Sequence, residues 1–393
     1  MPTVVAGALR TDQILAAKVP VEMRDVIDAL DQERAFFEFL SRQIGGGVKS
    51  IENMRYDFLE QIAYPQVMTV NAISAAAATT VAVDNPSYAH RDQLIYNTRT
   101  GEFYLMNEDV GGVGTGGSIT VMGHTGAGGI LAATAVGDIL QIGPEAHAEG
   151  EAIPLAYSIQ ERARFVYLFQ HDRTRGNTDI QAATREYGPN QLKLDRIQFF
   201  IDEMRKLNLL MYIGKQMREV ASASGPRRHS MSGIIEQIST NVVDFSAIPS
   251  GLTLAAAGEM MRQAMSHAAA AKTKIGICGQ RAWNAFSAMP VAAIQTSVSE
   301  TEWGKRLKTL VTPYGNQAIG YDNQLTDANG LGGYFFLLDP NRIERLQLEG
   351  QPTRLELNVQ ANNDIHNQTD VITGTDGIRL GLEELHAYAK GIN

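Results

Sequence analysis

The segment from about residue 65 to residue 152 constrains the fold of this chain most strongly, because its composition differs sharply from that of the flanking sequence. It is rich in Gly, Ala and Thr, carries few charges, and separates short alternating runs with turn signals, which is typical of β-strands. The runs are Val67–Val70, Thr80–Val83, Leu94–Tyr96, Phe103–Leu105, Ser118–Met122 and Asp138–Ile142. Asn97–Gly101, between two of them, has hairpin composition, with Gly101 free to adopt a positive φ. We therefore expect a small all-β module inserted into a longer chain.

Helical patterns flank this module. Residues 1 to about 20 have weak periodicity and indicate an extended arm, whereas Val21–Ile44 repeats apolar residues at helical spacing until Gly45–Gly47 ends the pattern. The longest helix is predicted over Pro189–Ala221. Its apolar stripe is Ile197, Ile201, Met204, Leu207 and Met211, and the residues expected away from the stripe are Asp202, Glu203, Arg205 and Lys206.

Strands and helices alternate in the rest of the chain, which indicates a layered domain and, with the β-module, an α+β fold. Helices are expected over Leu252–Ala271, capped by Ser250 or Thr253, and over Gln280–Ala288. Ser222–His229, which contains Gly225-Pro226, is predicted to be a loop. Strands are expected at Arg164–Gln170, Thr178–Thr184, Ile275–Ile277, Lys308–Val311, Ala318–Tyr321, Tyr334–Leu338, Leu355–Val359 and Ile378–Leu382.

Charge and cysteine content exclude some classes of protein. The formal net charge of −9 argues against a surface built to bind nucleic-acid phosphates, although an acidic wall around DNA would also be expected to repel it. Cys278 is the one cysteine, so no internal disulfide or cysteine metal cluster is possible, and we expect it to act as a small buried hydrophobe. No signal-peptide pattern is seen, and no apolar run approaches the roughly 18 residues of a membrane span.

Candidate catalytic motifs each favour a structural interpretation. Gly112–Gly117 matches G-x-G-x-x-G, but a β-run follows it where a dinucleotide site needs a helix, so we expect a loop. The histidines (90, 124, 147, 171, 229, 267, 366 and 386) never fall at H-x-x-x-H spacing. His171-Asp172 and Asp364–His366 are expected to be surface residues at strand edges, and Asp202-Glu203 and Glu383-Glu384 a solvated face or subunit contacts. We therefore predict no catalytic, cofactor-binding or metal-binding residues.

The order of these parts is an arm, a short helix, a β-rich excursion, a long helix, an α/β lobe and terminal strands. That order resembles the major head protein of tailed bacteriophages with the Hong Kong 97-type fold. Local sequence also resembles this family. The similar segments are Asn97–Glu102, Ala135–Ile142, Ala146–Gly150, Ser232–Asn241, Ile275–Trp283 and Phe336–Pro340.

The resemblance implies a division of the chain. Residues 1–50 would be the N-terminal arm and short helix, and 51–163 the extended loop, with the β-module at about 65–152. Residues 164–245 would form the peripheral domain with its spine helix at 189–221, 246–350 the axial domain, and 351–393 C-terminal strands returning to the peripheral domain.

The resemblance also implies a function: a non-enzymatic capsid subunit that self-assembles into hexamers and pentamers and encloses phage dsDNA in an icosahedral head. The implied partners are other copies of the chain, a separate scaffold protein, a portal, an optional decoration or cement protein, and DNA by non-specific contact. No membrane partner or cofactor is implied. The implied location is the virion, after assembly in the host bacterial cytoplasm. Two alternatives stay open: an encapsulin-like nanocompartment shell, and an enzyme with an inserted β-domain.

Overall fold

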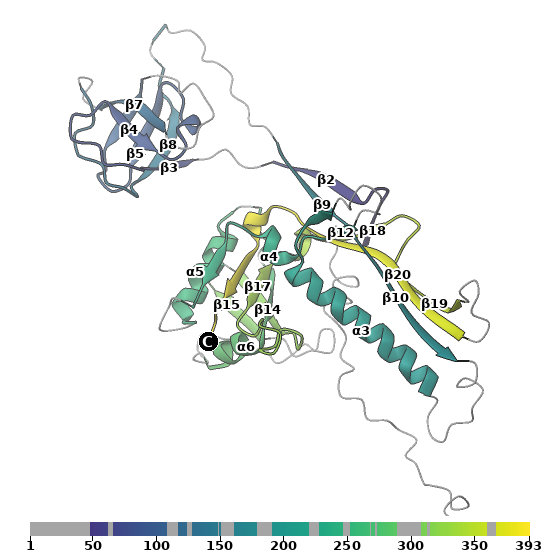
Figure 1. Cartoon of the computed structure of the whole chain (residues 1–393). Coiled ribbons are helices and arrows are strands. Elements are labelled where there is room, and N and C mark those ends of the chain that lie inside the picture. The colour runs from purple at the N-terminus through teal and green to yellow at the C-terminus, as the bar shows by residue number, and fades with distance from the viewer. Residues whose placement is uncertain are drawn as a thin grey trace, which may run out of the picture. The chain divides into compact units, whose positions relative to one another are not determined.

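The chain divides into two units in this computed structural model (Figure 1). Residues 59–163 form one, here called the inserted unit, and residues 1–58 with 164–393 form the other, the main unit. The described residues are 48–61, 66–107, 117–123, 128–147, 149–150, 161–178, 191–219, 228–246, 252–267, 269–271, 273–288, 308–312, 315–359 and 367–393. The arm and the helix expected before residue 45 lie outside them.

The inserted unit is a closed antiparallel barrel. Its strands are β3 (Val67–Thr69), β4 (Thr80–Val83), β5 (Gln93–Asn97), β6 (Phe103–Met106), β7 (Gly117–Gly123) and β8 (Ile139–Glu145), in the order β3-β8-β5-β6-β7-β4. A bridge between Val70 and Val83 joins the two outer strands. Asn71 N–H also donates to Ala82 O at 2.9 Å. Closure gives both outer strands a partner, so neither is left as a template for uncontrolled pairing.

The barrel has its own apolar core, built from inward-facing side chains of alternating strand positions. The core residues are Met68, Val70, Val81, Val83, Ala89, Ile95, Tyr104, Met106, Ile119, Val121, Ile130 and Leu140. All six strands predicted from alternation are confirmed, and Gly101 adopts the expected positive φ of 72° in the β5–β6 turn. Alternation succeeds here because each strand has one face in the core and one in solvent.

The first sheet of the main unit is built around one long strand, β20 (Asn367–Leu380). Its order is β1-β18-β20-β10, and β19 also pairs with β20. The other strands are β1 (Val48–Ile51), β10 (Phe169–Thr178), β18 (Ile343–Leu348) and β19 (Arg354–Val359). Helix α3 (Gln191–Ile213) runs beside β10 and β20 (Figure 1). A separate two-stranded sheet pairs β2 (Arg55–Glu60) with β9 (Arg162–Tyr167).

Two strand predictions in this region are wrong in their bounds. The strand expected at Arg164–Gln170 is divided between β9 and β10, because Leu168 leaves the ladder and donates its N–H to Met54 O at 2.9 Å. The strand expected at Ile378–Leu382 is the end of β20, which begins eleven residues earlier at Asn367. The first part of β20 was missed because it contains many polar residues, so it shows little of the apolar alternation on which the strand prediction was based. Of the segment expected at Thr178–Thr184, only Thr178 is described, as the end of β10.

Helix α3 ends at Ile213, eight residues before the predicted end at Ala221. Gly214 follows it, and Gly233 donates its N–H to Gly214 O at 2.8 Å. A Cβ on Gly233 would lie 2.5 Å from Gly214 N, so the two backbones meet only because neither residue has a side chain. Beyond this contact β11 (Met217–Glu219) pairs antiparallel with β12 (Arg228–Ser230), which corrects the predicted helix end. Of the loop predicted at Ser222–His229, only Arg228 and His229 are described, and they belong to β12.

The predicted apolar stripe of α3 is only partly confirmed. Leu207 and Met211 are buried, but Ile197 is 46% exposed. The buried face instead follows Phe199, Glu203, Leu207, Asn208, Met211 and Tyr212. The apolar pattern misses this face because two of its members, Glu203 and Asn208, are polar and have partners in segments that are distant in the sequence.

The second sheet of the main unit is covered on both faces. Its order is β13 (Val242–Asp244), β21 (Ala387–Lys390), β17 (Phe335–Leu338), β14 (Thr273–Cys278), β16 (Gly315–Tyr321) and β15 (Lys308–Thr312). In β17, Phe335 and Leu337 pack with α5 (Leu254–Met265) and α6 (Gln280–Ala288). Phe336 and Leu338 pack on the other face with α4 (Ile234–Gln237) and the end of α3. Two covered faces explain why β17 is apolar throughout.

Several predictions here are confirmed. Helix α6 has the predicted bounds, Cys278 is buried in the core beneath it, and the Thr253 hydroxyl caps α5 by accepting from Ala256 N at 3.2 Å. Helix α5 ends at Met265, before the predicted end at Ala271. Of the C-terminal strands, β19 and β20 join the first sheet, but β21 lies in the second. No helix in the described ranges is long and apolar enough to cross a membrane.

Candidate functional site

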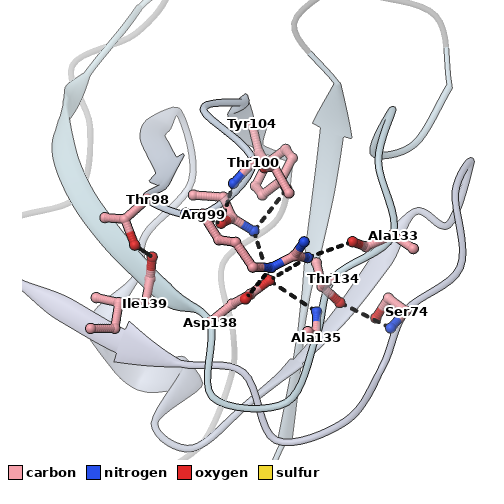
Figure 2. A network of polar contacts seen from close by, with 11 residues as sticks. Ser74, Thr98, Arg99, Thr100, Tyr104, Ala133, Thr134, Ala135, Asp138 and Ile139 are labelled. Carbon is pink, nitrogen blue, oxygen red and sulfur yellow. Dashed lines mark hydrogen bonds and ion pairs between the residues drawn. The ribbon is translucent and has the colours of Figure 1, made fainter.

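The inserted barrel holds one loop in place with a network of polar contacts (Figure 2). Residues 130–138, here called the pinned loop, precede β8 and face the β5–β6 turn. From that turn, the Arg99 guanidinium points at the Asp138 carboxylate, with Nε 2.5 Å from Oδ1, and its Nη2 also donates to Ala133 O at 2.7 Å (Figure 2). The hydrogen bond from Arg99 is the largest of the causes that lower the pKa of the Asp138 carboxyl to about 2.

Further contacts fix the rest of the pinned loop. The Glu102 carboxylate accepts from the backbone N–H groups of Leu131 and Ala132. Ser74 N–H donates to the Thr134 hydroxyl at 2.9 Å, and Thr134 N–H donates back to Ser74 O at 3.0 Å (Figure 2). These partners come from segments distant in sequence, so the loop conformation depends on the barrel being folded. Leu131 and Val136 nevertheless keep their side chains 61% and 64% exposed.

A buried charge network joins α3 to the first sheet. His171 on β10 lies between two carboxylates, with Nε2 3.3 Å from Asp376 Oδ2 and Nδ1 3.5 Å from Glu203 Oε1. Arg345 donates to Asp376 at 2.7 Å, and Arg173 contacts Glu203 at 3.5 Å. Burial alone would raise the pKa of Asp376, but the hydrogen bond from His171 and the charge of Arg345 outweigh it, and the pKa is lowered.

These contacts correct two sequence expectations. His171 and Glu203 were expected to be exposed, yet both are buried; Asp172, the neighbour of His171, is exposed as expected. Glu383 is also buried: it accepts from Arg164 Nη2 at 2.7 Å and from the Ser239 hydroxyl at 2.6 Å. Buried charges require such partners, because an unpaired one is costly. A pattern of apolar residues contains no sign of them.

A second buried group ties the C-terminal segment to the second sheet. Lys274 Nζ lies 3.7 Å from Asp339 Oδ2 and donates to Leu385 O. His386 Nδ1 accepts from Asp339 N–H at 3.2 Å, and its Nε2 is 3.3 Å from Gly381 O, so the neutral ring with hydrogen on Nε2 satisfies both contacts. Burial is the main reason that the pKa of His386 is lowered to about 4 and that of Lys274 to about 8.

The chemistry of these groups is that of structural support. Within the described residues, no group of three or more His, Cys, Asp and Glu side chains could hold a metal ion. The buried charges described above are engaged with one another or with backbone groups and do not converge on an open nucleophile. The glycine-rich motif is described only at Gly117, which begins β7; His124 and Asp364–His366 lie outside the described residues.

A model of the SU10 major capsid protein family matches residues 11–393. The chain belongs to this family. It is therefore a shell protein of a phage head, located in the virion shell, and the family is one of structural capsid proteins. No curated protein sequence matches it significantly.

Several solved structures are similar to this capsid protein. The capsid chain of an empty GTA particle is 8% identical with a TM-score of 0.50, covering 99% of this chain and 100% of that one. A chain of Mycobacterium phage Ogopogo is 11% identical with a TM-score of 0.45, covering 98% and 99%. An encapsulin of Synechococcus elongatus is 8% identical with a TM-score of 0.41, covering 61% and 78%. The GTA capsid chain, with its TM-score of 0.50 over both whole chains, supports the Hong Kong 97-like capsid fold that the order of parts predicted.

Proposed function

We propose that copies of this capsid protein form hexamers and pentamers, and that these build an icosahedral head enclosing phage dsDNA. The observation that carries the proposal is the family match over nearly the whole chain. Building two kinds of ring from one subunit requires interfaces that tolerate two local geometries. Two compact units, each with its own core, suit that requirement.

The distribution of exposed apolar side chains supports this assembly. Among the described residues they occur in both units, as expected for a subunit that contacts neighbours on many sides. They are Val48, Leu59, Val67, Ile73, Phe103, Leu131, Val136, Ile139, Phe165, Ile197, Phe200, Ile213, Met217, Leu357 and Val359.

We propose that the parts of the chain take the roles of the domains that the resemblance implies. In this proposal residues 164–245 are the peripheral domain, 246–350 the axial domain, and the module at 65–152 lies over an adjacent subunit. A barrel with its own core suits that role, because it can keep its shape while the chain around it changes position between rings.

The further partners are also proposals. A separate scaffold protein would set shell curvature, a portal would occupy one vertex, and a decoration or cement protein would bind the finished shell. Packaged DNA would meet the inner wall by non-specific contact only, consistent with the net charge of −9. Assembly would take place in the host bacterial cytoplasm.

Electron microscopy of the purified protein tests the assembly itself. We expect capsomers from the chain alone and closed shells when it is co-expressed with its scaffold. Light scattering across a range of salt concentrations gives an independent measure of size. A protein that stays strictly monomeric under all these conditions would contradict the proposal.

Deletion of residues 66–150 tests the role of the module. With Pro65 joined to Glu151, the main unit keeps its five-stranded and six-stranded sheets, so the variant should stay soluble and helical by circular dichroism. We expect it to form no closed shells. Normal shells from this variant would show that the module is dispensable for assembly.

A further inference from the structure

The strands β2 and β9, here called the connecting strands, are both anchored at one place in the main unit. Strand β2 leads into the inserted unit and β9 leads out of it. On β2, the Phe58 ring lies beneath the Arg379 guanidinium, whose Cζ is 4.4 Å from the ring centre. On β9, Arg164 Nη2 donates to Glu383 Oε1 at 2.7 Å. Arg379 and Glu383 lie on either side of the end of β20, so both connecting strands are held there.

Residues 381–386, here called the crossover, carry the chain from the first sheet of the main unit to the second. Strand β20 before them belongs to the first sheet, and β21 after them belongs to the second. Within the crossover Leu382 has a left-handed backbone, with φ 53° and ψ 79°, which a residue with a side chain adopts only where its surroundings hold it. Asn241 supplies part of that hold, since its Nδ2 donates to Glu384 O at 2.7 Å and to His386 O at 3.0 Å. The crossover therefore contains a strained turn that depends on partners outside it.

Glu383 is the residue of the crossover that contacts a connecting strand. Its side chain is only 5% exposed, and besides Arg164 it binds the Ser239 N–H and the Ser239 hydroxyl, accepting from each at 2.6 Å. If β9 moved away and took Arg164 with it, the buried carboxylate would lose a cation that compensates its desolvation. A less compensated buried charge favours a rearrangement that returns it to water. In this chain that rearrangement requires the crossover to leave its strained turn.

We propose that the Arg164–Glu383 ion pair couples the position of β9 to the order of the crossover, so that displacing β9 loosens β21 in the second sheet. Coupling between two sites is reciprocal, so loosening the crossover must also weaken the hold on β9. The coupling is a property of a single folded copy and does not depend on the assembly proposed above. In an assembling subunit it would make the second sheet respond to the path of the inserted segment.

Hydrogen exchange in unassembled subunits tests the coupling. Arg164→Met keeps a side chain of similar length but removes the charge. We expect roughly tenfold faster exchange at residues 387–390 of β21, which follow the crossover, because a charge-assisted hydrogen bond that holds it is lost. The matched control is Arg162→Met on the same strand, since Arg162 pairs with Glu60 Oε2 at 2.6 Å and not with the crossover. It should leave exchange at 387–390 unchanged.

A substitution on the opposite side of the crossover tests reciprocity. Asn241→Ala removes the two hydrogen bonds from its side chain to the crossover backbone. Exchange should then become faster at residues 165–167 of β9, beside Arg164. Faster exchange in the crossover of this variant, with residues 165–167 unchanged, would contradict the coupling.

Residues 195–205 of α3 serve as the internal reference that separates coupling from general destabilisation. Their exchange should stay as in wild type when Arg164→Met speeds exchange in β21. An equal rise in α3 and β21 would show that the substitution weakens the whole unit, and it would overturn the proposal, as would unchanged exchange at 387–390. If Arg164→Met does not fold, Arg164→Gln, which keeps a hydrogen-bond donor without the charge, is judged by the same criteria. Each of these results leaves the proposed function standing, because shell formation is measured separately.

Discussion

Arg99 and Asp138 lie 39 residues apart in the sequence and form an ion pair that ties the β5–β6 turn to the loop before β8. The Asp138 side chain is buried, whereas that of Arg99 is about half exposed. The same carboxylate accepts from Ala135 N–H at 2.9 Å, within the loop itself. Asp138 thus links the β5–β6 turn to the backbone conformation of the loop before β8. Both belong to the module that we propose lies over a neighbouring subunit.

Asp138→Asn should destabilise the inserted unit by about 1–3 kcal/mol, because the buried hydrogen-bond acceptors lose their charge and one of them becomes a donor. Hydrogen exchange at residues 130–138 measures the effect. Asp57→Asn removes an exposed ion pair with Arg55 and should change stability by less than about 0.5 kcal/mol. Equal protection of the loop in wild type and Asp138→Asn would contradict the assigned role.

Asp138 also predicts a response to acid. Its folded-state pKa of about 2 lies below the ordinary value of 3.8, so its contribution to stability is complete above that value and is lost as pH falls toward 2. Between pH 4 and pH 2, Asp138→Asn should therefore lose less stability than wild type. Urea unfolding at several pH values in that range provides the comparison.

His386 makes the main unit sensitive to acid at a higher pH. Its pKa is lowered from 6.5 to about 4, so below pH 6.5 the unfolded chain takes up a proton that the folded chain does not. Stability should fall by about 3 kcal/mol as pH drops from 6.5 to 4. In His386→Asn, whose amide does not titrate, this part of the pH dependence should disappear, whereas the exposed control His267→Asn should keep it.

Two glycine-to-alanine substitutions should have opposite signs. In Gly233→Ala the new Cβ would meet backbone atoms at 2.5 Å and 2.8 Å, so the α3–α4 junction must shift, at a cost of at least about 2 kcal/mol. In Gly258→Ala nothing lies within 4 Å of the Cβ inside α5, and the variant should gain about 0.5–1 kcal/mol. Thermal unfolding of both variants tests the prediction; a stable Gly233→Ala would mean that the junction is adaptable.

Two alanine substitutions in helix α3, one at a buried and one at an exposed position, should differ in their effect on stability. Leu207→Ala removes a buried side chain and should cost about 2–5 kcal/mol, whereas Ile197→Ala, at an exposed position, should cost less than about 1 kcal/mol. Urea unfolding of unassembled subunits gives both values. If Ile197→Ala impairs assembly without changing subunit stability, Ile197 lies in an interface between copies.

The strands of the barrel were predictable because the features that specify them lie between residues close together in the sequence. Each strand has one buried and one exposed face, so alternation appears in the sequence, and Gly101 appears where the turn needs a positive φ. Helix α6 was predictable for a similar reason, since its bounds follow from neighbouring residues. The pinning of residues 130–138 was not, because Arg99, Glu102 and Ser74 reach the loop from other segments.

The sequence by itself determined the order of parts, the strands of the inserted module and the burial of Cys278. Only the tertiary structure decided where α3 ends, which sheet receives β21, and that His171, Glu203 and Glu383 are buried. The physical reason is the same in each case. A charged side chain is buried only when a partner compensates its desolvation, and two backbones approach closely only where glycines meet. Those partners are distant in sequence, so they become neighbours only in the folded chain.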